Sequence, residues 1–262
     1  MLGATDSDEV DFGRTATDYR NFRAGFPDEF FQRLGNQIGL RAGQKALDLG
    51  TGTGTVARGL ARRGMQVVGI DPAARLLHEA AALDRLAGVE VTYREGRAEK
   101  LPFADNMFDL VVAGQCWHWF DRGLAAAEAL RVLSPGGAVV IAHFDWLPLP
   151  GNVVEATEAL IRRANPQWSM AGGTGIYTQW LGDLAGARFT ELETQSFDLV
   201  QPYSHEAWRG RVRASAGVGA SLDEGTIAAF DAELGALLAS AYSNEPLAVP
   251  HRVWWVTGRR RK

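Results

Sequence analysis

The stretch "KALDLGTGTGTVA", Lys45 to Ala57, decides how this chain folds. A short apolar run containing Asp48 leads directly into three glycines that alternate with threonines. A strand, a glycine turn and a helix start are typical of nucleotide-binding sites, because unpaired N–H groups at the helix start can donate hydrogen bonds to a polar ligand group. Glycine also lets the backbone approach that ligand closely. Two cofactor classes use such loops, so this stretch alone leaves the cofactor open.

Composition limits the class of protein. The chain has 262 residues, of which 46% are hydrophobic and 22% charged, as in ordinary globular proteins. Its net charge of −4 argues against a general nucleic-acid binder. The single cysteine, Cys116, excludes an internal disulfide and a cysteine-based metal site, so we expect no metal. The terminal "GRRRK" is interpreted as a solvated tail.

No apolar run approaches the about 18 residues that a membrane span needs, and we expect no membrane partner. The acidic start "MLGATDSDEVDFG" does not match a signal peptide. We therefore expect a cytoplasmic protein.

Strand-like runs alternate with helical stretches along most of the chain. This alternation predicts an α/β fold with a doubly wound, mainly parallel sheet. Strands are expected at 45–49, 66–71, 89–96, 108–115, 138–144, 188–200 and 252–258, and helical stretches include 55–64, 72–86, 124–137 and much of 204–242. We expect one domain over 1–262, with an N-terminal helical lid segment (1–40), a cofactor-binding core (41–145) and cap elements (146–187 and 204–245).

Asp71 sharpens the cofactor assignment. It ends the second predicted strand, about twenty residues after the loop, where an acid can bind both ribose hydroxyls of a nucleoside. The glycine spacing is G-x-G-x-G, not the G-x-G-x-x-G of dinucleotide sites. A dinucleotide also needs the helix start for its pyrophosphate, whereas S-adenosylmethionine has no phosphate. The spacing therefore favours S-adenosylmethionine over NAD.

Four segments in order extend this interpretation: "ALDLGTGTG", "VVGIDPA", "GRAEKLPFADNMFDLVVAGQCWHWFD" and "ALRVLSPGGAVVIAHF". On these residues the chain resembles the class I S-adenosylmethionine-dependent methyltransferases, in the small-molecule group that includes ubiquinone-biosynthesis and trans-aconitate methyltransferases. The resemblance implies a Rossmann-like methyltransferase fold of seven strands, with the last strand antiparallel and a helical cap insertion. It also implies an enzyme that methylates a small-molecule acceptor.

The resemblance assigns cofactor-binding roles to matching positions. The amino-acid end of the cofactor would lie at the glycine loop and the ribose at Asp71. The adenine would lie at the turns that follow the second and third predicted strands. The residues are Asp48, Gly50, Thr51, Gly52 and Gly54 for the amino-acid end, Asp71 for the ribose, Pro72, Arg97 and Ala98 for the adenine, Gln115 for the methionine portion, and Tyr19 and Arg23 as a closing segment. The family usually has Gly-Asp-Ala where this chain has Gly96-Arg97-Ala98. Either Glu99 or a backbone carbonyl would then replace the missing carboxylate.

The acceptor side is predicted at "QCWHWFD", 115–121, because ligands of open α/β sheets bind at the carboxyl ends of the strands. His118 is the candidate base, since imidazoles exchange protons near neutral pH. Packing at the strand end is its alternative role. The predicted substrate pocket comprises Trp117, Trp119, His143 and Asp145. Arg209, Arg211 and Arg213 either meet an anionic substrate or form a solvated helix face.

Two alternatives to an active methyltransferase stay open at this point. One is a domain that binds S-adenosylmethionine or S-adenosylhomocysteine without transferring a methyl group, because no residue here is an indispensable catalyst. The other is an NAD-dependent oxidoreductase, against which the G-x-G-x-G spacing counts. The sequence leaves three properties open: the acceptor, its attacked atom and the oligomeric state.

Overall fold

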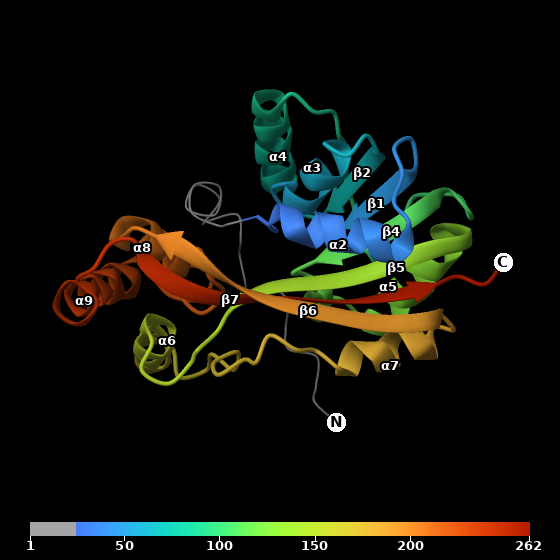
Figure 1. Cartoon of the computed structure of the whole chain (residues 1–262). Coiled ribbons are helices and arrows are strands. Elements are labelled where there is room, and N and C mark those ends of the chain that lie inside the picture. The colour runs from blue at the N-terminus through green and yellow to red at the C-terminus, as the bar shows by residue number, and fades with distance from the viewer. Residues whose placement is uncertain (1–24) are drawn as a thin grey trace. The chain divides into compact units, whose positions relative to one another are not determined.

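A computed structural model describes residues 25–262, in which seven strands form one sheet (Figure 1). The strands are β1 (Lys45–Leu49), β2 (Gln66–Asp71), β3 (Thr92–Glu95), β4 (Phe108–Gly114), β5 (Leu133–Trp146), β6 (Thr190–Tyr203) and β7 (Leu247–Arg259). Their order is β3-β2-β1-β4-β5-β7-β6; the first five run parallel and β7 runs antiparallel. The predicted doubly wound, mainly parallel sheet with an antiparallel last strand is confirmed.

The described residues form two compact units. The core unit comprises Gly25–Phe144, Tyr177–Phe197 and Val253–Lys262, and the helical unit comprises Asp145–Ile176 and Asp198–Arg252. Strands β5, β6 and β7 each contribute residues to both units. The two units are described separately below.

The centre of the sheet in the core unit is buried on both faces. Leu47 of β1 pairs with Val68 of β2 on one side and with Val111 of β4 on the other. Leu47 and Val111 have no exposed surface, as expected for parallel strands with both faces covered. Because these strands are parallel, their carboxyl ends lie along one edge of the sheet. The residues that follow Leu49, Asp71 and Gly114 are therefore brought to that edge.

Six helical segments belong to the core unit: α2 (Asp28–Ile38), α3 (Thr55–Ala61), α4 (Ala74–Ala87), η2 (Trp117–Trp119), α5 (Arg122–Val132) and α7 (Gln179–Gly186). Helix α2 buries an apolar stripe that includes Phe30 and Phe31. Gly59 of α3 lies against Phe31, and a Cβ at this position would overlap the Phe31 ring. The close packing of α2 on α3 therefore requires glycine at position 59.

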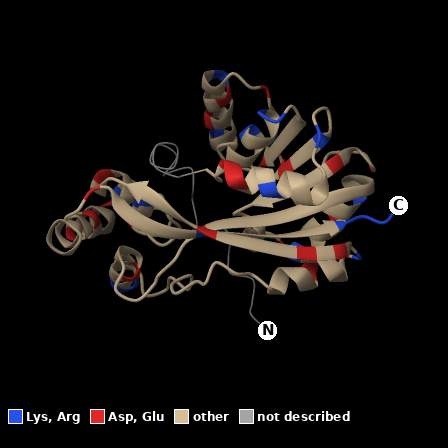
Figure 2. Cartoon of the chain, in the orientation of Figure 1, with Lys and Arg blue, Asp and Glu red and all other residues tan. Residues whose placement is uncertain are grey.

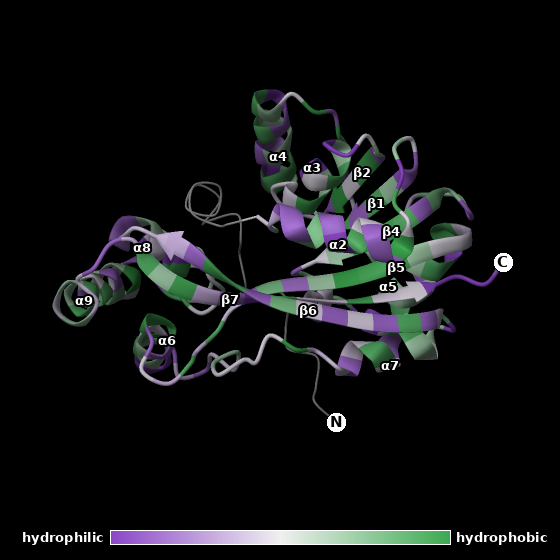
Figure 3. Ribbon diagram, viewed as in Figure 1, coloured by the Kyte–Doolittle hydropathy of each residue, from purple (hydrophilic) through white to green (hydrophobic). Residues whose placement is uncertain are grey.

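Strand β6 ends the sheet and carries the polar pattern of an edge strand. Glu191 and Glu193 are exposed, and acidic bands on this strand are visible in Figure 2. Figure 3 shows hydrophilic segments along β6, whereas β5 and β1 are largely hydrophobic. Charged side chains on an edge strand oppose pairing with another chain.

The junction between α5 and β5 differs from the prediction. The sequence suggested that the helix extends into "LSPGG", but α5 ends at Val132. Phe108 pairs with Leu133 and Leu110 pairs with Ala138, so β5 has three more residues than β4 between these pairs and bulges out. Pro135 has no N–H to donate, and Gly136 has a φ of +81°. These two residues favour a bulge over a continued helix.

The basic C-terminus also differs from the prediction of a solvated tail. The guanidinium of Arg260 donates to the backbone carbonyls of Leu130, Arg131 and Leu133. Two of these carbonyls lie in the last turn of α5, where carbonyl groups have no partner within the helix. Arg260 therefore caps α5, a role that its place in a run of basic residues did not indicate.

The helical unit contains α6 (Val153–Ala164), α8 (His205–Arg213) and α9 (Glu224–Ala241). Each begins with a side-chain cap, provided by Asn152, Ser204 and Asp223 respectively. The helices enclose their own hydrophobic cluster, in which Trp208 is fully buried and its indole N–H donates to Thr157. This cluster gives the unit a core of its own. Residues 177–187, expected among the cap elements, lie in the core unit.

Among the described residues no helix is both long and apolar enough to cross a membrane.

Candidate functional site

The glycine loop between β1 and α3 adopts a conformation that few other residues accept. Gly50, Gly52 and Gly54 have φ values of +57°, +54° and +76°. The Thr51 N–H donates to the Ile70 carbonyl of β2 at 3.0 Å, which ties the loop to the neighbouring strand. A Cβ on Gly50 would lie 2.9 Å from the Cβ of Cys116. Backbone conformation thus favours glycine at all three positions, and close packing adds a second reason at Gly50.

Asp48 lies buried beneath this loop. Its Oδ2 atom accepts hydrogen bonds from the Thr51 hydroxyl at 2.7 Å and from the Ala57 N–H at 3.1 Å. Its Oδ1 atom is buried and has no hydrogen-bond partner among the described residues. Burial, opposed by these two hydrogen bonds and aided by the nearby Asp71, raises the pKa of Asp48 to about 7.

Asp71 joins the same loop from the end of β2. Its Oδ2 atom accepts from the Gly52 N–H at 2.9 Å, and its Oδ1 atom accepts from the Ala73 N–H at 2.9 Å. Burial raises the pKa of Asp71, while the hydrogen bonds from Ala73 and Gly52 oppose that shift. The loop and the two acids that the sequence singled out are therefore in one place.

The predicted adenine edge follows β3. The Gly96 N–H donates to the Asp71 carbonyl at 3.2 Å, which brings this turn to the end of β2. Arg97 and Pro72 are exposed, whereas Ala98 is buried in the core. One oxygen of Glu99 accepts from the Asp121 N–H at 3.0 Å. Glu99 therefore already bonds Asp121, whose side chain caps the N-terminus of α5.

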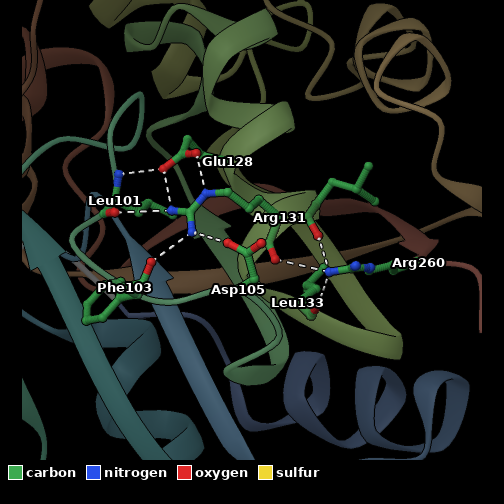
Figure 4. A network of polar contacts seen from close by, with 8 residues as sticks. Leu101, Phe103, Asp105, Glu128, Arg131, Leu133 and Arg260 are labelled. Atoms are coloured by element: carbon green, nitrogen blue, oxygen red, sulfur yellow. Dashed lines mark hydrogen bonds and ion pairs between the residues drawn. The ribbon is translucent and has the colours of Figure 1, made fainter.

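The loop after this turn is held by Arg131 of α5 (Figure 4). The guanidinium donates to the carbonyls of Leu101 at 3.1 Å and Phe103 at 2.8 Å. It also bonds the carboxylates of Asp105 and Glu128, and Glu128 accepts from the Leu101 N–H. Five donors in a planar fork allow one arginine to bind all these acceptors.

Gln115 occupies a strained backbone position just after β4. Its φ is +62°, which is uncommon for a residue with a side chain. Its amide nitrogen Nε2 donates to the Phe144 carbonyl at 2.7 Å, and its backbone N–H donates to Ala142 at 2.8 Å. Such conformations cluster at functional sites because surrounding structure must maintain them.

The aromatic residues after β4 separate into two kinds. Trp117 is fully buried, and its indole N–H donates to Asp183 of α7 at 3.0 Å. His118 and Trp119 are partly exposed, with ring centroids 4.6 Å apart. A substrate contact therefore fits Trp119 better than Trp117, whose side chain fills the core; both roles stay predictions.

His143 of β5 extends this aromatic group. Its ring centroid lies 5.3 Å from that of His118, 4.4 Å from that of Tyr177 and 4.7 Å from that of Trp180. Tyr177 and Trp180 stack at 4.2 Å with nearly parallel rings. The structure thus brings the predicted residues His118, Trp119 and His143 together. It adds Tyr177, just before α7, and Trp180, within α7.

Asp145 lies in the helical unit, near the buried His251. Burial, supported by the charge of Arg211 and opposed by that of Asp145, lowers the pKa of His251 to about 4. The His251 Nδ1 atom lies 3.0 Å from the Val249 carbonyl. Since this carbonyl only accepts, the neutral ring carries its proton on Nδ1.

The three arginines of α8 have different partners. Arg209 and Arg213 both form ion pairs with Asp231 of α9. The guanidinium of Arg211 lies 4.8 Å over the ring of Trp146. The helix face is therefore neither simply solvated nor uniformly cationic.

The predicted closing residues Tyr19 and Arg23 lie outside the described residues.

Sequence reasoning missed three residues beneath the glycine loop. Arg58, Asp84 and Tyr93 form a polar network there. Their positions on α3, α4 and β3 are separated in sequence, and each resembles an ordinary surface residue of an amphipathic element. One sequence signal could have indicated them. The loop consists of small residues without interruption, and small residues leave room for a large side chain beneath them.

A five-stranded parallel sheet, continued by an antiparallel last strand, with acids at the ends of β1 and β2 around a glycine loop, defines the class I methyltransferase fold. Residues 47–141 match the model of the methyltransferase domain family. This match confirms the resemblance to S-adenosylmethionine-dependent methyltransferases.

Known proteins with similar sequences are methyltransferases by name. The chain is 36% identical over 128 residues to an uncharacterised methyltransferase of Mycobacterium tuberculosis, which covers 49% of each chain. It is 29% identical over 205 residues to the 27-O-demethylrifamycin SV methyltransferase of Amycolatopsis mediterranei, covering 70% of this chain and 75% of that protein. The chain spans about half the length of the first curated relatives that it matches.

A solved structure shares the fold. Phosphoethanolamine N-methyltransferase 2 of Haemonchus contortus, in complex with S-adenosyl-L-methionine, superposes with a TM-score of 0.57 at 19% identity. The match covers 96% of this chain and 57% of that one.

Proposed function

We propose that the core unit binds S-adenosylmethionine at the glycine loop and transfers its methyl group to a small-molecule acceptor. The observation that carries this proposal is the pair of buried carboxylates, Asp48 and Asp71, that hydrogen-bond the same glycine loop from two adjacent strands.

The surroundings of Asp48 suit a cationic group. Its buried Oδ1 atom has no partner among residues 25–262, and its raised pKa reports the cost of holding a charge there. An ammonium group at this position would favour the ionised carboxylate and remove that cost. The amino-acid end of S-adenosylmethionine carries such a group.

The surroundings of Asp71 suit a diol. Each of its oxygens accepts one backbone N–H and keeps capacity for a second donor. Two ribose hydroxyls supply such donors. By contrast, the pyrophosphate of a dinucleotide would face two buried acids beside the loop, which supports S-adenosylmethionine over NAD.

The bound cofactor supplies a methyl group on a sulfonium, ready for in-line displacement. The chain then has to orient the acceptor and, for an acceptor that loses a proton, receive that proton. We assign the second task to His118, and its partial exposure just past the carboxyl end of β4 supports this. Trp119 and Tyr177 offer aromatic faces that favour a nearby cation before transfer.

The size of the acceptor is proposed from relatives. The relatives include the rifamycin methyltransferase, a malonyl-[acyl-carrier protein] O-methyltransferase and a ubiquinone biosynthesis O-methyltransferase. One of these names specifies a demethylated rifamycin, one a malonyl group on a carrier protein, and one the biosynthesis of ubiquinone. They support a small organic group at the reacting end.

A two-part experiment tests the proposal. S-adenosylhomocysteine should raise the melting temperature of the protein, whereas NAD should leave it unchanged. Labelled S-adenosylmethionine should then pass its methyl group to at least one member of a panel of small hydroxyl, amine, thiol and carboxylate compounds. Stabilisation by NAD alone would overturn the cofactor assignment. Tight binding of S-adenosylhomocysteine with no transfer across the panel would favour a non-catalytic binding domain.

A further inference from the structure

Three side chains form a polar network directly beneath the glycine loop. The Nε atom of Arg58 lies 2.8 Å from Oδ1 of Asp84, and the hydroxyl of Tyr93 donates to Oδ2 of the same carboxylate at 2.7 Å. The Arg58 and Asp84 side chains are only 11% and 5% exposed. The network joins α3, α4 and β3 at one point.

Two members of the network contact the loop itself. The Nη2 atom of Arg58 donates to the Thr53 carbonyl at 2.9 Å, within the glycine sequence. The hydroxyl of Tyr93 lies against Gly54, where an added Cβ would overlap it. The ring of Tyr93 also lies against Gly69 of β2, with 2.8 Å between its Cε1 atom and an added Cβ. The network therefore contacts the loop at Thr53 and Gly54, beside the residues that Asp48 and Asp71 bond.

The Tyr93 hydroxyl is a constant hydrogen-bond donor in this network. Burial, with the hydrogen bond to Asp84, raises the pKa of Tyr93 far above its usual range. The phenol hence stays protonated and always donates to Asp84. Removing this donor would leave a buried carboxylate oxygen without one of its partners, which is costly in a poorly solvated place.

We propose that Tyr93 is a positioning residue for the cofactor: through Asp84 and Arg58 it sets the conformation of the Thr53–Gly54 segment and thereby the affinity of the loop for its ligand. This inference rests on the proposed function. Tyr93 would not contact the cofactor and would act only through the loop.

The test compares two variants with the same chemical change. Tyr93→Phe removes the hydroxyl beneath the loop. Tyr242→Phe removes a hydroxyl that donates to the Asn152 carbonyl at 3.0 Å in the helical unit. Calorimetric titration with S-adenosylhomocysteine, well below both melting temperatures, should give a Kd about tenfold higher for Tyr93→Phe and unchanged for Tyr242→Phe. Both variants should show a lower melting temperature than the wild type.

A second variant keeps the inference testable if Tyr93→Phe does not fold. Asp84→Asn keeps a side chain of similar shape but removes the negative charge that pairs with Arg58, and it should also raise the Kd. A Tyr93→Phe or Asp84→Asn protein that is destabilised yet binds S-adenosylhomocysteine as the wild type does would overturn the inference and leave the proposed function standing. Absence of binding by the wild type would instead refute the proposed function.

Discussion

The carboxylate of Asp71 accepts one hydrogen bond from Gly52 and another from Ala73, each at 2.9 Å. A single side chain therefore fixes both the glycine loop after β1 and the approach to α4. Its position links the two parts of the site that would hold opposite ends of an S-adenosylmethionine molecule.

Replacement of Asp71 by alanine should weaken the binding of S-adenosylhomocysteine at least tenfold, because hydrogen bonds to a charged group contribute about 1.5–3 kcal/mol. Isothermal titration calorimetry measures this directly. Asp109→Ala is the matched control, since Asp109 also accepts a backbone N–H, from Lys45 at 2.8 Å, but at the start of β4. Unchanged affinity in Asp71→Ala would reassign Asp71 to loop structure alone.

Asp48 should make cofactor binding depend on pH. Because its pKa is raised to about 7, the carboxyl group of the free protein is protonated below that pH and ionised above it. Affinity for a ligand with an ammonium group should therefore increase as the pH rises from 5.5 to 8.5, by up to about tenfold per pH unit below the pKa.

The variant Asp48→Asn should lose most of this pH dependence, since the amide does not titrate. Titrations with S-adenosylhomocysteine at several pH values measure the effect. A wild-type profile that is flat over this window would contradict the assignment of Asp48 to the ammonium group.

His118 should affect turnover far more than cofactor affinity if it accepts a proton from the acceptor. For a hydroxyl or amine acceptor identified in the panel, His118→Ala should lower kcat by about a hundredfold or more. The Kd for S-adenosylhomocysteine should change little. His78→Ala is the control, because His78 is exposed on α4. Equal turnover in wild type and His118→Ala would restrict His118 to packing.

His251 should contribute to stability near neutral pH and lose that contribution in acid. Its pKa falls to about 4 on folding, so between about pH 6.5 and pH 4 the unfolded chain binds a proton that the folded chain does not. The free energy of unfolding should then decrease as the pH falls through this range, by up to roughly 3 kcal/mol from this group.

Urea denaturation of the wild type and of His251→Gln at pH 7.5 and pH 4.5 tests this. The difference in stability between the two pH values should be smaller in the variant, whatever its absolute stability. An equal difference in both proteins would show that His251 does not titrate in this way. Comparing differences removes the contribution of Asp48, whose raised pKa acts in the opposite direction.

The local patterns of the sequence were sufficient to predict the sheet and the positions of the two acids, Asp48 and Asp71. Buried parallel strands are short apolar runs, and the positions of Asp48 and Asp71 follow from where those runs end. The glycines predict the loop, because the positive φ values at these positions exclude most other residues.

Features that depend on distant partners were not predictable in this way. Tyr93 and Arg260 are ordinary residues in their local context, and only the fold reveals that one supports the loop and the other caps α5. Trp117 illustrates a different limit. The position of Trp117 after a strand end predicts that its side chain lies near the site. It does not predict that the indole turns inward and donates to Asp183.

The Arg131 network has a consequence for the entropy of binding. The loop from Leu101 to Asp105 lacks regular structure, yet one guanidinium and its partner Glu128 hold it at four points. Its conformational freedom is therefore lost when the protein folds rather than when a ligand arrives. A nucleoside bound along this edge would meet a surface already ordered, so less of its interaction energy would be spent on immobilising the chain.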